Sequence, residues 1–382
     1  MYVLVRSLDG LALIAAATAP LAAESQFPPN AVIQQILDER VAEQRTFGVV
    51  LGTMDAGGRI HLYHAGSSGQ EDVSLDGDSV FEIGSISKTF NTALLADMVM
   101  RGEVKLDDPV AKYLPSTVKV PERGGKQITL YDLAIHSSGL PRLPANLQPA
   151  DMANPYADYT VDQMYQSLSG YQLERDIGAR YEYSNLGSGL LGHALARRVG
   201  KSWEDTVTER ILEPLGMTDT RITLTADMRR RLAIGHSETL QPVPLWDMPT
   251  LAGSGALRST VNDMLKYLAA NMDPTSKPLG AILATTHISQ HEAGSPKLTI
   301  GLGWHILHLP DGAGIVFHTG GTGGYRSFIG FDPVKHIGVV MLTNSAIGAH
   351  DIAIHLIDQR APLANPRAGP KEIETESGTR EQ

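Results

Sequence analysis

The chain has 382 residues, a formal net charge of −10 and no cysteine. The acidic balance, with no basic cluster, argues against a nucleic-acid-binding surface, and the lack of cysteine excludes disulfides, thiolate metal sites and a cysteine nucleophile. Hydrophobic residues make up 42% of the chain and charged residues 19%, so we expect a globular protein of one large domain or two lobes.

The two ends of the chain differ from the rest. Arg6 precedes an apolar run over residues 11–17, and Leu21-Ala22-Ala23 offers a small-residue cleavage site, which predicts a signal peptide over residues 1–23. A short N-terminal helix or a misassigned start is the alternative. An exported chain without cysteine fits the bacterial periplasm, and no later apolar run predicts a transmembrane segment. Residues 361–382 predict a disordered tail, which leaves residues 24–360 as the folded domain.

Strand signals gather near both ends of this domain, five segments in all. These segments are residues 47–52, 59–64, 314–318, 326–331 and 336–343. An amphipathic segment follows over residues 347–357, and the middle of the chain, residues 106–298, carries mostly helical signals and long loops. We therefore predict an α+β fold: an antiparallel sheet built from both chain ends and flanked by helices, with an inserted, mostly helical lobe.

The sequence Ser85-Ile86-Ser87-Lys88 opens a helical pattern. Residues 80–83 predict a short strand, Gly84 permits a sharp turn, and apolar residues then recur at helical spacing up to Gly102. A serine and a lysine three positions apart on one helical turn lie side by side. Serine needs a neighbouring base to act as a nucleophile, and lysine can be that base if burial and nearby cations lower its pKa.

This four-residue pattern is weak alone. A helix-capping serine followed by an exposed lysine gives the same letters. A second copy at residues 116–119 lies between Pro115 and Pro121, so we expect it in a loop with no helix to aim its side chains. The pattern at Ser85 therefore needs partners elsewhere in the chain.

Tyr183-Ser184-Asn185 offers the first partner. A tyrosine two positions before an asparagine places both side chains on one side of an extended turn. The phenol can shuttle a proton if cations depress its pKa, and the amide can hold both a lysine and a substrate carbonyl. Tyr181 is a rival phenol without this spacing, and the alternative is a surface loop that caps the next helix.

His318-Thr319-Gly320 offers the second partner, and Gly321 follows it directly. Glycines allow a strand edge to lie against a ligand without interference from side chains. Their backbone N–H groups can donate to an oxyanion. A glycine-rich hairpin turn is the alternative.

The three motifs, in this order, resemble those of the serine β-lactamase and penicillin-binding-protein superfamily, most closely its class C β-lactamase-like branch. That branch also holds D,D-peptidases and β-lactamase-fold esterases. The resemblance covers residues 45–360, with further familial stretches at 133–141, 213–217 and 301–304. It implies a β-lactamase-like fold and a serine hydrolase without a cofactor or metal.

The resemblance also implies a role for each motif residue. Ser85 is the expected nucleophile, with Lys88 and Tyr183 carrying its proton. The remaining expected roles are an oxyanion hole from the backbone N–H groups of Ser85 and Gly321, and substrate binding by Asn185, His318, Thr319 and Gly320. The implied substrates are β-lactams or the related D-Ala-D-Ala of peptidoglycan peptides. A carboxylesterase and a penicillin-binding sensor that never turns over are the alternatives.

Two departures from the family pattern bear on the substrate. His318 stands where these enzymes usually carry lysine, and we expect its protonated form to bind the substrate carboxylate. Leu143 stands where the family has a glutamine that contacts the substrate amide, so efficient β-lactam recognition is in doubt.

Two other kinds of site are not favoured. The chain has no Gly-x-Ser-x-Gly sequence, which argues against an α/β-hydrolase. His287 with His291, and His61 with His64, have spacings that suit a metal, but neither pair has an evident third ligand. We expect these histidines to be exposed polar residues and predict no metal site.

Overall fold

The structure is a computed structural model that describes residues 26–364. The expected signal peptide, residues 1–23, lies outside the described residues. Of the expected tail, residues 361–382, only the first four are described. Both expectations therefore remain predictions.

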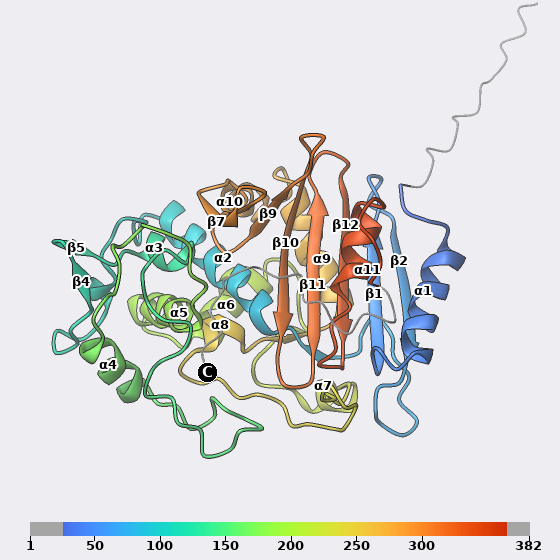
Figure 1. Cartoon of the computed structure of the whole chain (residues 1–382), viewed down its shortest axis with the longest axis horizontal. Helices are drawn as coiled ribbons and strands as arrows, with labels where there is room; N and C mark the ends of the chain where they lie inside the picture. The colour runs from blue at the N-terminus through green and yellow to red at the C-terminus, as the bar shows by residue number, and fades with distance from the viewer. Residues whose placement is uncertain (1–25, 365–382) are drawn as a thin grey trace, which may run out of the picture.

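An eight-stranded antiparallel sheet forms the centre of the molecule (Figure 1), with the strand order β2-β1-β12-β11-β10-β9-β8-β7. Its strands are β1 (Gly48–Met54), β2 (Ile60–Gly66), β7 (His291–Ser295), β8 (Leu298–Ile300), β9 (His305–His308), β10 (Gly314–Gly321), β11 (Arg326–Asp332) and β12 (Ile337–Thr343). Because β1 pairs with β12, the two ends of the chain meet in one sheet, as the sequence predicts.

Helices cover both faces of this sheet. On one face, α1 (Asn30–Ala42) and α11 (His350–Ile357) bury Val49 and Leu51 of β1; on the other face, α9 (Val261–Met272) packs with Val50. This alternation follows from the two-residue period of a strand. Beside α9 lie α2 (Ser87–Met100) and α10 (Gly280–Thr286).

A second lobe lies beyond α2, on the left of Figure 1. Its helices are α3 (Leu130–Ala134), α4 (Val161–Gly170), α5 (Asn185–Val199), α6 (Trp203–Val207) and α8 (Ala252–Gly255). The remaining elements are short: β3 (Phe81–Glu82) pairs with β6 (Arg258–Ser259), β4 (Glu122–Arg123) pairs with β5 (Lys126–Gln127), and α7 (Ala226–Arg230), η1 (Gly84–Ile86), η2 (Val110–Tyr113) and η3 (Thr208–Leu212) are single turns. The arrangement confirms the predicted α+β fold with an antiparallel sheet built from both chain ends.

Three local features differ from the sequence expectation. Strand β7 begins at His291, inside residues 106–298, which were expected to be mostly helical. Helix α9 also belongs to residues 106–298, but it packs on the sheet and not in the helical lobe. Strand β7 is mostly exposed and its pairing with β8 shifts register, so it lacks the apolar alternation that marks a strand. Ser85 lies in the 3₁₀ turn η1 that precedes α2, not in the α-helix itself.

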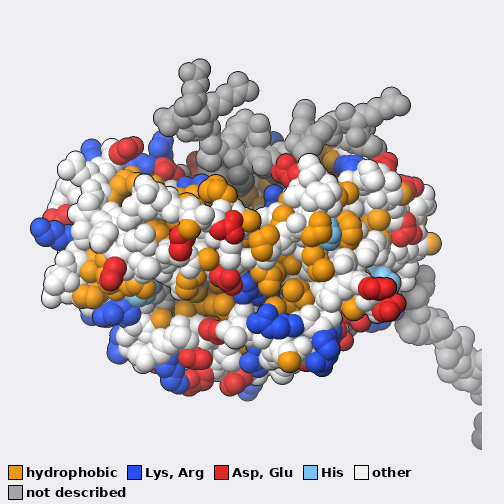
Figure 2. Space-filling view, turned by 90° about the horizontal axis from the view of Figure 1, so that it is seen from below, with side chains coloured by type: hydrophobic (Ala, Val, Ile, Leu, Met, Phe, Trp, Pro, Cys, Tyr) orange, Lys and Arg blue, Asp and Glu red, His pale blue; other side chains and the backbone are white. Residues whose placement is uncertain are grey.

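The surface fits a protein with mixed charges. On the face shown in Figure 2, Lys and Arg side chains are interspersed with Asp and Glu, and hydrophobic side chains lie between them. Within residues 26–364, no helix is both long and apolar enough to cross a membrane.

Candidate active site

The three motifs meet where the helical lobe joins the sheet. Ser85 lies in η1, and Lys88 lies in the first turn of α2. Asn185 is the first residue of α5, with Tyr183 two residues before it. The third motif forms the end of β10, which packs directly against η1. Segments separated by more than 200 residues thus form one site.

Glycines allow β10 to lie close to η1. Gly84 has a φ of +48°, and a Cβ added there would stand 2.7 Å from the backbone nitrogen of Gly321. A Cβ added at Gly320 would stand 2.0 Å from the carbonyl oxygen of Ile83, which also accepts a hydrogen bond of 2.8 Å from Ser327 Oγ. The backbone of Gly321 therefore lies beside the turn that carries Ser85.

Lys88 is fully enclosed between three oxygen atoms. Its side chain is 1% exposed, and Nζ lies 3.0 Å from Ser85 Oγ, 2.8 Å from Asn185 Oδ1 and 2.6 Å from the carbonyl oxygen of Ser254. Burial, helped by the positive charge of Arg142, lowers the pKa of Lys88 well below its usual value. Among the described residues no carboxylate pairs with it.

This geometry suits a neutral amine. The amide oxygen of Asn185 and the carbonyl of Ser254 can only accept hydrogen bonds, so they use the two N–H groups of an uncharged lysine. The remaining lone pair then faces Ser85 Oγ, the one neighbour of the three that can donate. Lys88 is therefore placed to accept the proton of Ser85.

Tyr183 covers Lys88 from the other side. Its ring centroid lies 4.7 Å from Lys88 Nζ. Burial raises the pKa of Tyr183 to about 12, and the hydrogen bond with Ser85 and the charge of Arg142 only partly oppose this effect. The expected depression of this pKa by nearby cations does not occur, because the desolvation of the phenol outweighs them. The phenol is thus a proton donor in the free protein.

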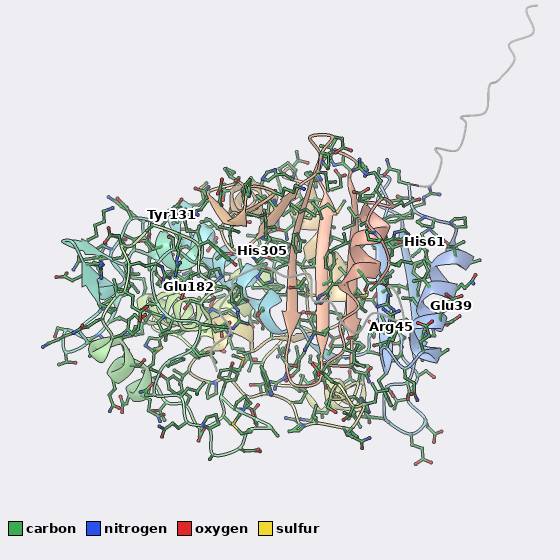
Figure 3. The ribbon with its side chains drawn as sticks, viewed as in Figure 1. Glu39, Arg45, His61, Tyr131, Glu182 and His305 are labelled. Atoms are coloured by element: carbon green, nitrogen blue, oxygen red, sulfur yellow. The ribbon has the colours of Figure 1, made fainter. Side chains whose placement is uncertain are left out.

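The rival phenol, Tyr181, has a different partner. Its hydroxyl group lies 3.0 Å from Nε2 of His305, a residue of β9. Figure 3 labels His305 between the sheet and the helical lobe. Burial raises the pKa of Tyr181 and lowers that of His305 to about 4. Tyr181 and His305 therefore form a neutral pair next to the site.

His318 is a buried residue of β10. Its side chain is 2% exposed, and Nδ1 donates to the carbonyl oxygen of Thr319 at 2.6 Å. Nε2 is buried without a hydrogen-bond partner in the described part of the chain. Burial, together with the nearby His305 and Lys88, lowers the pKa of His318 well below 6.5. These observations argue against the protonated His318 expected from the sequence.

Three further residues shape the site, and the sequence motifs do not include them. Ser254, in α8, contributes only its backbone carbonyl, which leaves no side-chain signature. His136 accepts a hydrogen bond of 3.1 Å from the backbone N–H of Ser184 and so fixes the turn between Tyr183 and α5. The guanidinium of Arg142 lies 5.1 Å from the centroid of the Tyr183 ring. The sequence signal for His136 was the familial stretch 133–141 that contains it, and the signal for Arg142 was the departure from the family pattern at the adjacent Leu143.

The competing motifs are placed elsewhere. The second Ser-x-x-Lys copy, residues 116–119, lies in a turn without helix, as expected. His287 is not an exposed residue: its Nε2 lies 2.8 Å from Asn271 Oδ1, and its ring packs on Trp304 and Phe331. Over residues 26–364 no group of three or more potential ligands is arranged to hold a metal ion.

A serine whose hydroxyl group faces a buried lysine, in an α+β fold of this topology, defines a class of serine hydrolases. The chain belongs to the β-lactamase family, because the family model described as Beta-lactamase matches residues 33–361. This match confirms the resemblance found in the sequence.

Individual relatives agree with this assignment. The D-alanyl-D-alanine-carboxypeptidase/endopeptidase AmpH of Escherichia coli strain K12 is 30% identical over 342 residues, which cover 84% of this chain and 87% of the relative. A β-lactamase of Pseudomonas fluorescens is 26% identical over 350 residues, covering 82% and 93%. The crystal structure of a class C β-lactamase from Rhodobacter sphaeroides superposes with a TM-score of 0.74 at 28% identity, over 86% of this chain and 99% of that one. The protein is therefore an enzyme of the class C β-lactamase and D-alanyl-D-alanine carboxypeptidase type.

Proposed function

We propose that this protein is a periplasmic serine hydrolase that forms an acyl-enzyme on Ser85. Its substrates would be β-lactam amides, the D-Ala-D-Ala end of peptidoglycan peptides, or both. The observation that carries the proposal is the position of Lys88 Nζ, 3.0 Å from Ser85 Oγ and enclosed by two obligate acceptors. The periplasmic location depends on the signal-peptide pattern in residues 1–23.

Acylation would begin with the neutral Lys88. Its lone pair takes the proton of Ser85 as Oγ attacks the substrate carbonyl, and the lysine becomes positively charged. Negative charge develops on the carbonyl oxygen, which the backbone N–H groups of Ser85 and Gly321 would stabilise. The close approach of β10 to η1 supports this pairing of donors.

Tyr183 would then protonate the leaving group. A phenol with a pKa of about 12 remains protonated at neutral pH, and its ring lies against Lys88. Once its proton has gone to the leaving amine, the phenolate can recover a proton from the charged Lys88. In deacylation the same pair would act in reverse and activate a water molecule. Asn185 would orient the acyl group while it holds Lys88, and Thr319 and Gly320 would meet the substrate along β10.

A second candidate function, carboxylester hydrolysis, is favoured by one observation. The neutral, buried His318 does not supply the cation that lysine gives at this position in most of the family. A substrate without a carboxylate would not need that cation. Ester hydrolysis would use the same Ser85 and Lys88.

Time-resolved intact mass spectrometry of the mature protein mixed with a penicillin tests the proposal. An adduct of one intact drug mass that forms and decays would support a β-lactamase cycle, and a persistent adduct would favour a peptidase or a sensor. Release of D-alanine from a peptide that ends in D-Ala-D-Ala separates these two. The Ser85→Ala variant, as the matched control, should form no adduct. If the wild type shows neither an adduct nor D-alanine release but hydrolyses short esters, the esterase is the correct assignment.

A further inference from the structure

The two basic residues of the sequence motifs are not accessible to a substrate. Lys88 is 1% exposed, and all its hydrogen-bonding capacity is used inside the protein. His318 is 2% exposed and neutral. Yet penicillins and D-Ala-D-Ala peptides carry a carboxylate close to the bond that is cleaved. A substrate of either kind would need another positive group at the entrance of the site.

Arg142 is a candidate for this positive group. The residue is exposed, and its guanidinium lies 5.1 Å from the centroid of the Tyr183 ring. Its backbone carbonyl accepts hydrogen bonds from the N–H groups of Asn185, at 2.9 Å, and Leu186, at 3.3 Å. The start of α5 thus fixes the backbone of Arg142 beside two of the proposed site residues.

Arg142 differs from Arg175 and Arg180 in having no acidic partner among the described residues. Arg175 and Arg180 both pair with Glu182, which Figure 3 labels in the helical lobe. Across residues 26–364, the Arg142 side chain forms neither an ion pair nor a hydrogen bond, and its one contact of a polar kind is with the Tyr183 ring. An arginine stacked on an aromatic ring keeps its N–H edge available for a planar anion.

We propose that Arg142 is a substrate-binding residue that recognises a carboxylate of the substrate at the entrance of the site. This inference rests on the proposed function, because it names a charge on the substrate that acylates Ser85. The carboxylate can belong to the leaving group or to the acyl group. Both make the same bidentate contact with a guanidinium, so the experiment must separate them.

Three matched esters make this separation. Phenyl butyrate carries no charge, 3-carboxyphenyl butyrate carries a carboxylate on the leaving group, and phenyl hemisuccinate carries one on the acyl group. We expect Arg142→Gln to lower kcat/KM by about 10- to 100-fold for one of the two charged esters, mainly through KM, as the loss of a charge-assisted hydrogen bond would. Hydrolysis of phenyl butyrate should change by less than about threefold, and Arg142→Lys should recover part of the loss.

The matched control is Arg180→Gln, which removes an exposed arginine that pairs with Glu182. An equal loss on all three esters, or the same selective loss in Arg180→Gln, would overturn the inference, since Arg142 would then act on the site in general or through net charge. A melting temperature close to that of the wild type would show that Arg142→Gln is folded.

Failure of the proposed function gives a different result. In that case the wild type hydrolyses none of the esters and forms no acyl-enzyme. The affinity of 3-carboxyphenyl butyrate and phenyl hemisuccinate for the wild type and Arg142→Gln, measured by calorimetry, then decides the inference alone. Binding weakened by Arg142→Gln supports it, and equal or absent binding in both proteins rejects it.

Discussion

The two walls of the candidate site are built on different principles. The helical wall, formed by α2, α5 and α8, encloses Lys88, and its Nζ has three hydrogen-bond partners. The strand wall, formed by β10, presents glycine backbone and a histidine whose Nε2 is buried without a hydrogen-bond partner in residues 26–364. The hydrogen bonds of the helical wall are complete in the free protein, whereas the strand that we propose to face the substrate has unused hydrogen-bonding capacity among the described residues.

This difference separates proton transfer from recognition. A general base must be able to accept a proton, and the burial that lowers the pKa of Lys88 favours its neutral form. Recognition needs groups that the substrate can still bind, such as the N–H of the exposed Gly321. Substitutions in the helical wall should therefore affect the chemical step most, and substitutions in the strand wall should have smaller effects.

The largest effect is expected at Lys88. Lys88→Arg places a permanent positive charge where the base was, because a guanidinium does not lose its proton at neutral pH. We expect a loss of about 10⁴-fold in the acylation rate, at the upper end of what a general base contributes. Stopped-flow kinetics with a chromogenic β-lactam or an activated ester would measure it. Lys88→Met controls for the size and charge of arginine, and its acylation rate should fall by as much. If either variant keeps a tenth of the wild-type rate, another residue acts as the base.

The next effect is expected at the phenol beside Lys88. Tyr183→Phe removes the proton donor but keeps the ring that packs on Lys88 and Arg142, so we expect kcat to fall by about 10²- to 10³-fold. Tyr181→Phe is the matched control, since its hydroxyl group contacts His305 and not Lys88. Steady-state kinetics on one amide and one activated ester would show the difference. Equal losses in the two variants would mean that the phenols support the structure and carry no proton.

The third test concerns the strand wall. A Cβ at Gly320 would stand 2.0 Å from the carbonyl oxygen of Ile83, and so Gly320→Ala must push β10 away from η1. The displaced N–H of Gly321 should cost about 10²-fold in kcat, close to the loss of one oxyanion donor. Gly321→Ala meets only the flexible side chain of Arg326, at 3.1 Å, and should lose less than about fivefold. A Gly321→Ala variant as impaired as Gly320→Ala would show that the close approach to η1 is not what matters.

The sequence predicted the helical wall better than the strand wall. The helical wall contains two pairs of side chains at fixed short spacings, Ser85 with Lys88 and Tyr183 with Asn185. Such spacings are visible directly in the amino-acid sequence. The contribution of Ser254 is a backbone carbonyl, and the ionisation of His318 depends on burial by strands that are distant in the chain. Strand β7 was hidden for a similar reason, because an exposed, irregularly paired strand has no hydrophobic alternation. The missed features all depend on tertiary contacts.

The smallest expected effect tests the charge of His318. Its pKa in the folded protein lies well below the value of 6.5 expected when it is exposed, so unfolding takes up a proton as the pH falls below 6.5. The free energy of unfolding should therefore rise with pH up to about 6.5, and His318 should contribute up to about 1.4 kcal/mol per pH unit to this slope.

Urea denaturation of His318→Gln between pH 5 and pH 7 should show a shallower slope than the wild type. His61→Gln, which changes an exposed histidine at the sheet edge labelled in Figure 3, should leave the slope unchanged. The contrary result is an unchanged slope in His318→Gln together with a KM for carboxylate substrates that rises above pH 7. It would mean that a protonated His318 binds the substrate carboxylate and that Arg142 is not required for this contact.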